Sequence, residues 1–159
     1  TAKHPNIHII HVESAAEMFA AATEAFPKAD VGILCAAVAD FTPSTTATEK
    51  IKREGDVLHL DLVATRDIAA TLGQAKRPDQ KLVGFALETA NEKEHAKAKL
   101  AKKHLDFIVL NSLNDKGAGF VHDTNKVTII AKNEERVFEL KKKSEVARDI
   151  IDYLCKSFD

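Results

Sequence analysis

The stretch VGILCAAV, residues 31–38, decides the fold class of this chain. It is apolar without the alternation of polar and apolar residues that marks a strand with one face in water. The pattern therefore predicts a parallel strand that is covered on both faces. The next residues, ADFTP (39–43), place the acidic Asp40 just after the carboxyl end of this strand. Ligands bind at that end in open α/β sheets, whereas the alternative is that Asp40 is a solvated turn residue.

Strand and helix patterns alternate on both sides of this stretch. A strand at 7–12 precedes a helix whose capping box is formed by Ser14 and Glu17. The other expected elements are strands at 57–62, 81–87 and 106–111, helices at 66–75 (capped by Thr65), at 92–104 and after Ser144 (as cap), and a hairpin of 126–132 with 136–140. We expect an α/β fold in one domain over 1–159: a doubly wound, mostly parallel, Rossmann-like sheet with helices on both faces and a C-terminal antiparallel hairpin.

The composition argues against several classes of function. The net charge is −1, with 45% hydrophobic and 30% charged residues, as in ordinary globular proteins. We therefore expect no nucleic-acid partner and no membrane partner. The two cysteines, Cys35 and Cys155, do not predict a structural disulfide and favour a reducing, cytoplasmic setting. The seven histidines show no metal-ligand spacing, so no metal site made by the protein is predicted.

Two groups of basic residues accompany the predicted strand ends. The long loop at 39–55 carries Lys50, and it is either a lid over phosphates or a solvated charged loop. The predicted helix at 92–104 carries Lys99 and Lys103, which are four residues apart and share a face. Complementing the helix dipole is a sufficient structural reason for these two lysines. Only the loop and the helix together suggest a polyphosphate site.

Familiar nucleotide and hydrolase motifs do not occur in the sequence. It contains no GxSxG elbow, no GxxxxGK[ST] loop and no glycine-rich turn at its start. A dehydrogenase-like domain that uses NAD(P) is therefore weakly supported, because its GxGxxG turn and its ribose-binding acid are both missing.

Six motifs, taken in order and spacing, resemble the phosphopantothenoylcysteine synthetase family, the synthetase domain of a bifunctional bacterial decarboxylase/ligase. They are AAVADFTP, EKIKRE, ATRDI, GFALET, KLAKKHLDFIVLN and GAGFVHDTNKVTII, and they cover residues 7 to 155 approximately. The resemblance implies a CTP-dependent ligation of 4′-phosphopantothenate with cysteine through an acyl-cytidylate, with Mg²⁺ carried by the triphosphate. It also implies a homodimer, and fusion to a decarboxylase domain that would bring the cofactor FMN.

The same resemblance implies roles for individual residues. Lys50 would be the catalytic flap lysine that reaches the triphosphate. The other implied residues contact or approach the nucleotide: Ala36 and Ala37 by backbone groups at the cytosine, Lys99 and Lys103 at the phosphates, and Asp40, Asp67, Phe85 and Asn111 around them. Small residues at the strand end let a base approach the backbone closely, which is a physical reason for the two alanines.

One departure from the family pattern concerns the N-terminal side. Family members begin with a βα unit that contains a glycine-rich turn and an asparagine before a Ser-Ser-Gly-Lys stretch, and neither precedes Thr1 here. We therefore expect an N-terminally truncated synthetase domain. Two hypotheses stay open: a CTP-dependent ligase, and a catalytically incomplete fragment that binds CTP and dimerises.

Overall fold

The computed structural model describes residues 4–53, 55–88, 91–112 and 122–158. The chain divides into two compact units. The first unit contains Thr1–Ala25 and Ala36–Ile68, and the second contains Phe26–Cys35 and Ala69–Asp159. The expectation of one domain over the whole chain stays a prediction. No helix among the described residues is long and apolar enough to cross a lipid bilayer.

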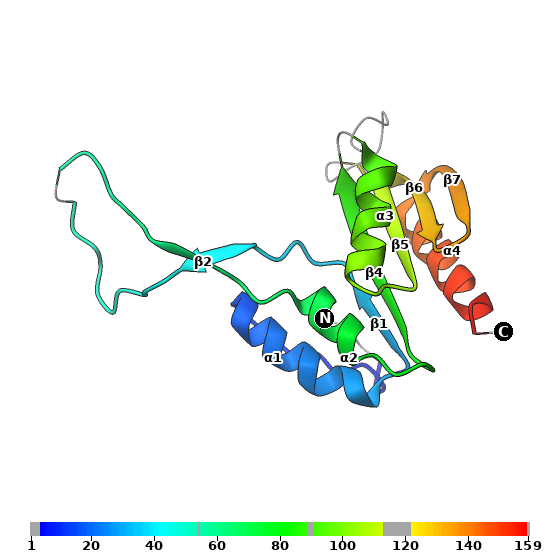
Figure 1. The fold of residues 1–159 in the computed structure, drawn as a ribbon, viewed down its shortest axis with the longest axis horizontal. Coiled ribbons are helices and arrows are strands. Elements are labelled where there is room, and N and C mark those ends of the chain that lie inside the picture. The colour runs from blue at the N-terminus through cyan, green and yellow to red at the C-terminus, as the bar shows by residue number, and fades with distance from the viewer. Residues whose placement is uncertain (1–3, 54, 89–90, 113–121, 159) are drawn as a thin grey trace. The chain divides into compact units, whose positions relative to one another are not determined.

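The second unit is built on a five-stranded sheet (Figure 1). Its strands, in spatial order, are β1 (Val31–Leu34), β4 (Lys81–Glu88), β5 (Phe107–Ser112), β6 (Thr124–Ala131) and β7 (Glu135–Lys142). The first three run parallel, and β6 and β7 are antiparallel to their neighbours. The predicted mixed sheet with a C-terminal antiparallel hairpin is therefore confirmed.

Two helices cover opposite faces of this sheet. On one face, Val83, Phe107 and Val109 pack with Val146 and Ile150 of α4 (Lys143–Lys156) into one buried cluster. Successive strand residues point to opposite faces, so the intervening buried side chains lie on the other face. There α3 (Glu92–Lys102) packs on β4 and β5, as Figure 1 shows. The apolar runs of β4 and β5 are thus explained by burial on both sides.

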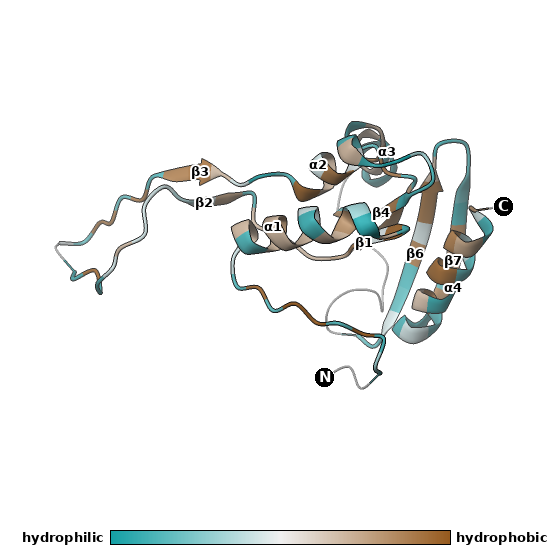
Figure 2. Ribbon diagram, turned by 90° about the horizontal axis from the view of Figure 1, so that it is seen from below, coloured by the Kyte–Doolittle hydropathy of each residue, from teal (hydrophilic) through white to brown (hydrophobic). Residues whose placement is uncertain are grey.

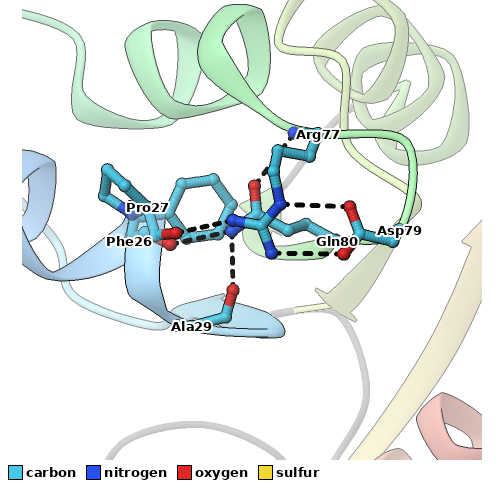
Figure 3. Close-up of polar contacts among 6 residues, drawn as sticks. All are labelled: Phe26, Pro27, Ala29, Arg77, Asp79 and Gln80. Carbon is cyan, nitrogen blue, oxygen red and sulfur yellow. Dashed lines mark hydrogen bonds and ion pairs between the residues drawn. The ribbon is translucent and has the colours of Figure 1, made fainter.

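A short segment that contains the buried Phe26 is hydrogen-bonded to the turn before β4 (Figure 3). The 3₁₀-helix η1 (Phe26–Lys28) presents its carbonyl groups to Gln80, whose side chain is 1% exposed. The Gln80 amide donates to the carbonyls of Phe26 and Ala29 at 2.8 and 2.6 Å, and its Oε1 accepts from the Arg77 N–H at 2.9 Å. Every hydrogen-bonding atom of this buried amide head is therefore engaged at least once.

The helix α2 (Ile68–Ala75) contains a glycine where the chain packs closely. A Cβ atom at Gly73 would lie 2.0 Å from the carbonyl oxygen of Lys103. Because that contact is with backbone, no side-chain rotation would relieve it. The absence of a side chain at Gly73 therefore allows α2 to approach the end of α3.

The first unit contains α1 (Ala15–Ala25) and an antiparallel pair, β2 (Phe41–Pro43) with β3 (Leu62–Ala64). The predicted capping box is confirmed, because Ser14 Oγ accepts from the Glu17 N–H and Glu17 Oε2 accepts from the Ser14 N–H, both at 3.1 Å. Figure 2 shows β3 and the segment before α1 as hydrophobic, although many of these side chains are exposed.

The strand predicted at 31–38 differs from the structure. The strand β1 ends at Leu34 and lies at the edge of the sheet, with the Ile33 side chain 42% exposed. It is a parallel strand, as predicted, and it pairs with β4, but the predicted burial on both faces is not found. An apolar run shows that a strand could be buried on both faces. It does not show whether the strand lies at the centre or at the edge of the sheet, because that depends on the other strands.

Three smaller predictions are also wrong. The range 7–12 is not a strand and belongs to no ladder of the described residues. The range 57–62 forms a strand only from Leu62 onward. The last helix begins at Lys143 and not after a Ser144 cap, since the Glu145 carboxylate accepts the N–H of Lys142, the residue that precedes the helix.

Candidate functional site

The carboxyl ends of β4 and β5 lie side by side in the second unit. In the parallel register, Phe85 pairs with Val109 and Leu87 pairs with Asn111. Two of the predicted site residues, Phe85 and Asn111, are therefore brought to neighbouring positions at the edge where α/β sheets bind ligands. Phe85 is half-buried and packs against the α4 cluster, and Asn111 shares that face by strand alternation.

The Asn111 side chain has a fixed partner on the next strand. Its Oδ1 accepts a hydrogen bond from Nδ2 of Asn125 at 2.9 Å, and Oδ1 of Asn125 in turn accepts from the Lys126 N–H at 3.0 Å. Asn125 lies within β6, which pairs antiparallel with β5. This contact orients the Asn111 amide.

Glu88, the last residue of β4, joins the strand to α3 on the opposite face. Its Oε1 accepts from Lys99 Nζ at 2.6 Å, and its Oε2 lies 3.5 Å from Nδ1 of His95. The hydrogen bond from Lys99 lowers the pKa of the Glu88 carboxyl below its usual range, and His95 adds to this effect. The Lys99 ammonium is thus held at the carboxyl end of β4. A lysine ammonium has three N–H donors, and one of them is engaged with Glu88.

Lys103 lies elsewhere, although it is only four residues after Lys99. It is the C-cap residue of α3, and its N–H donates to the Lys99 carbonyl at 3.0 Å. The chain then enters β5, where the Asp106 N–H donates to the carbonyl of Leu82 near the start of β4. The Lys103 backbone is therefore at the amino-terminal side of the sheet, while the Lys99 side chain reaches toward the carboxyl side.

The first unit places Ala36, Ala37 and Asp40 on one exposed segment that leads into β2. The Asp40 carbonyl accepts the Thr65 N–H at 2.9 Å, and the Ala39 carbonyl accepts the Thr65 hydroxyl at 2.6 Å. Thr65 was expected to cap a helix at 66–75, but α2 begins only at Ile68. Thr65 instead ties this segment to the ATRDI motif, which contains Asp67.

Lys50 lies in the connection between β2 and β3, and its side chain is exposed. The predicted loop of 39–55 is thus shifted, because residues 41–43 form β2 and the connection runs from 44 to 61. In the same connection Arg53 pairs with Asp56 at 2.6 Å, with both side chains largely exposed. An exposed lysine in a long connection can reach a ligand without disturbing a packed core.

Among the described residues, no group of three or more histidine, cysteine, aspartate or glutamate side chains could hold a metal ion. Mg²⁺ commonly binds through substrate phosphates and few protein carboxylates, so the expectation of Mg²⁺ carried by a triphosphate stays a prediction.

Reasoning from the sequence missed three partners of the predicted residues. Neither the His95 contact with Glu88, nor the Asn125 contact with Asn111, nor the link through Thr65 was predicted. The spacing of His95 and Lys99 at i and i+4 was available as a signal, but the carboxylate that joins them lies on a different element.

The comparisons with known proteins agree on one family. Residues 1–158 match the model of the DNA/pantothenate metabolism flavoprotein C-terminal domain. The chain is 57% identical over 147 residues to a "Cysteine/Cysteine sulfinic acid decarboxylase" from an unknown prokaryotic organism, covering 92% of this chain and 41% of that protein. It is 43% identical over 147 residues to the coenzyme A biosynthesis bifunctional protein CoaBC of Bacillus subtilis (strain 168), covering 92% of this chain and 36% of that protein.

A solved structure gives the same result. The crystal structure of the C-terminal domain of a coenzyme A biosynthesis bifunctional protein CoaBC matches with a TM-score of 0.73 and 36% identity, covering 91% of this chain and 63% of that one. The chain spans about two fifths of the length of the curated relatives, at 41% and 36%. The Rossmann-like fold and the match over nearly all residues show that this chain belongs to the DNA/pantothenate metabolism flavoprotein C-terminal domain family.

Proposed function

We propose that this chain is the phosphopantothenate–cysteine ligase module of coenzyme A biosynthesis and that it uses CTP. The observation that carries the proposal is the lysine held at the carboxyl end of β4, Lys99 on Glu88. Asn111 lies near the carboxyl end of the neighbouring strand β5, with its side chain on the opposite face of the sheet. The contact of Lys99 with Glu88 places a cation at the ligand-binding edge of a fold related to CoaBC.

The proposed reaction has two balanced steps. A carboxylate oxygen of 4′-phosphopantothenate attacks the α-phosphorus of CTP, which forms an acyl-cytidylate and releases pyrophosphate. The amine of cysteine then attacks the acyl carbon, forms the amide, loses a proton and releases CMP. Negative charge gathers on the α-phosphate and on the leaving pyrophosphate, so cations that meet it there lower the barrier.

The lysines take the phosphate roles in this proposal. Lys50 is the catalytic residue, because an exposed side chain on a long connection can follow the charge as it moves to pyrophosphate. Lys99 and Lys103 bind phosphates as point charges. The metal chemistry supplied by Mg²⁺ with the triphosphate is neutralisation of phosphate charge.

The remaining predicted residues take nucleoside-binding roles in this proposal. Backbone groups of Ala36 and Ala37 bind the cytosine, which suits their exposure and small side chains. The other nucleotide-binding residues in the proposal are Asp40, Asp67, Phe85 and Asn111. CTP is preferred over ATP in this proposal, and a competition series between the two nucleotides tests the preference.

The proposed partners are small molecules and a second copy of the chain. A homodimer is supported by exposed apolar side chains of the first unit, among them Phe41, Val57 and Leu60 at 61, 70 and 58% exposure. We propose a cytoplasmic setting and neither nucleic-acid nor membrane partners. FMN belongs to the proposal only where the chain is fused to a flavin-dependent decarboxylase.

The alternative is a CTP-binding, dimerising module without catalysis. It stays open because the chain spans only part of its relatives. A single-turnover assay with CTP, Mg²⁺, 4′-phosphopantothenate and cysteine separates the two. Pyrophosphate and CMP formed in equal amounts are expected for the ligase. CTP binding by calorimetry without pyrophosphate release would leave only the binding module.

A further inference from the structure

One carboxylate at the edge of the sheet contacts a lysine and a histidine of one helix. Lys99 and His95 are separated by one helical turn, so they project from the same side of α3 toward Glu88. The Glu88 side chain is 14% exposed, whereas that of Lys99 is 46% exposed. The acceptor is therefore fixed in the protein, and the ammonium it holds faces outward.

We propose that Glu88 is a positioning residue for the nucleotide, acting through Lys99. The inference rests on the proposed function, in which Lys99 binds a phosphate. A lysine has a flexible four-carbon stem, and immobilising it on a ligand costs conformational entropy. A carboxylate that already holds the ammonium at 2.6 Å removes part of that cost before the nucleotide arrives.

The charge of Glu88 by itself has the opposite effect on binding. A carboxylate close to a triphosphate repels it, so removal of the charge alone would tighten the complex. Positioning of Lys99 predicts instead that removal of the carboxylate weakens the complex. The sign of the change in affinity therefore discriminates between the two effects.

The chain offers a matched control on the same helix. Glu135, at the start of β7, holds Lys93 at 2.8 Å and Lys97 at 2.6 Å, both from α3. It is likewise one carboxylate with two basic partners from α3, but its lysines are not among the proposed phosphate ligands. Glu135→Gln therefore reproduces the change in charge and the loss of an ion-pair cluster without touching Lys99.

The experiment is calorimetric titration of the whole chain with CTP and Mg²⁺. The variants are Glu88→Gln, Glu88→Asp, Lys99→Met, the double variant Glu88→Gln/Lys99→Met, and the control Glu135→Gln. We expect both Glu88 variants to raise the Kd for CTP about three- to tenfold. Glutamine removes the negative charge that holds the Lys99 ammonium, and the shorter aspartate keeps the charge but no longer reaches the ammonium. In the Lys99→Met background, Glu88→Gln should change the Kd by less than about twofold. If Glu88 acts on the nucleotide through Lys99, its effect on affinity disappears once Lys99 is removed.

Thermal unfolding of each variant accompanies the titration, so that loss of fold is separated from loss of affinity. Tighter or unchanged binding by Glu88→Gln and Glu88→Asp overturns the inference. An equal loss of affinity with and without Lys99, or a similar loss in Glu135→Gln, also overturns it. If the unaltered chain binds no CTP, the proposed function itself fails and the role of Glu88 fails with it.

Discussion

Replacing Gln80 with methionine tests whether the amide network at the edge of the sheet stabilises the second unit. Methionine has a similar length and volume but no amide, so Gln80→Met removes two donated bonds and one accepted bond (Figure 3). The Phe26 carbonyl keeps the Ala29 N–H as a partner at 3.0 Å. The Ala29 carbonyl and the Arg77 N–H lose the bond to residue 80.

The expected loss of stability follows from the Ala29 carbonyl and the Arg77 N–H, the two groups that lose a hydrogen bond. A buried polar group left without a partner costs about 1 to 3 kcal/mol. Because Ala29 is only half-buried and the Arg77 residue is exposed, water can reach them, and the lower part of that range applies. We therefore expect Gln80→Met to lower the free energy of unfolding by about 2 to 3 kcal/mol. This corresponds to a decrease of roughly 4 to 12 °C in Tm.

Urea denaturation followed by circular dichroism measures this change. The matched control is Gln74→Met, the same substitution at an exposed position of α2. We expect the control to change stability by less than about 0.5 kcal/mol. If Gln80→Met unfolds at the same urea concentration as the unaltered chain, or if Gln74→Met costs as much, the network does not contribute as argued.

Three further predictions concern other parts of the chain. Gly73→Ala should lower the free energy of unfolding by about 2 kcal/mol or more, because the clash with the Lys103 carbonyl outweighs the better helix propensity of alanine. Urea denaturation measures the change, and the control Gln74→Ala, which makes no such clash, should not destabilise the chain. The pKa of the Glu135 carboxyl is lowered from 4.5 to about 2, by the Lys93 hydrogen bond first and then by that from Lys97, so its contribution to stability is present above pH 4.5 and is lost as the pH falls toward 2. The stability difference between the unaltered chain and Glu135→Gln should shrink over that range, and a constant difference would contradict the assignment. Lys50→Ala should reduce single-turnover pyrophosphate release at least about a hundredfold with little change in Tm, and normal turnover would remove Lys50 from the proposed catalytic role.

The sequence predicted the elements whose burial is determined locally. The strands β4 and β5 and the hairpin of β6 and β7 were predicted within a few residues because long apolar runs bounded by turn residues have few other solutions. The capping box at Ser14 was predicted because both of its partners lie within four residues. The segments 7–12 and 31–38 were misjudged because a strand needs neighbours, and an apolar pattern does not say how many neighbours the sheet provides.

At the candidate site, too, the sequence did not predict contacts that come from other elements. The spacing of Lys99 and Lys103 placed both on one face of a helix, and a shared phosphate site followed naturally from that spacing. In the structure, Glu88 draws the Lys99 ammonium toward the carboxyl ends of the strands, while the Lys103 backbone caps the helix at its other end and packs on Gly73. Two residues with the same local pattern thus have different surroundings, because each is determined by a contact from another element. The Lys99 ammonium is held at the carboxyl ends of the strands, whereas the Lys103 backbone lies at the amino-terminal side of the sheet. Lys99→Met should therefore weaken CTP binding more than Lys103→Met in the same calorimetric titration.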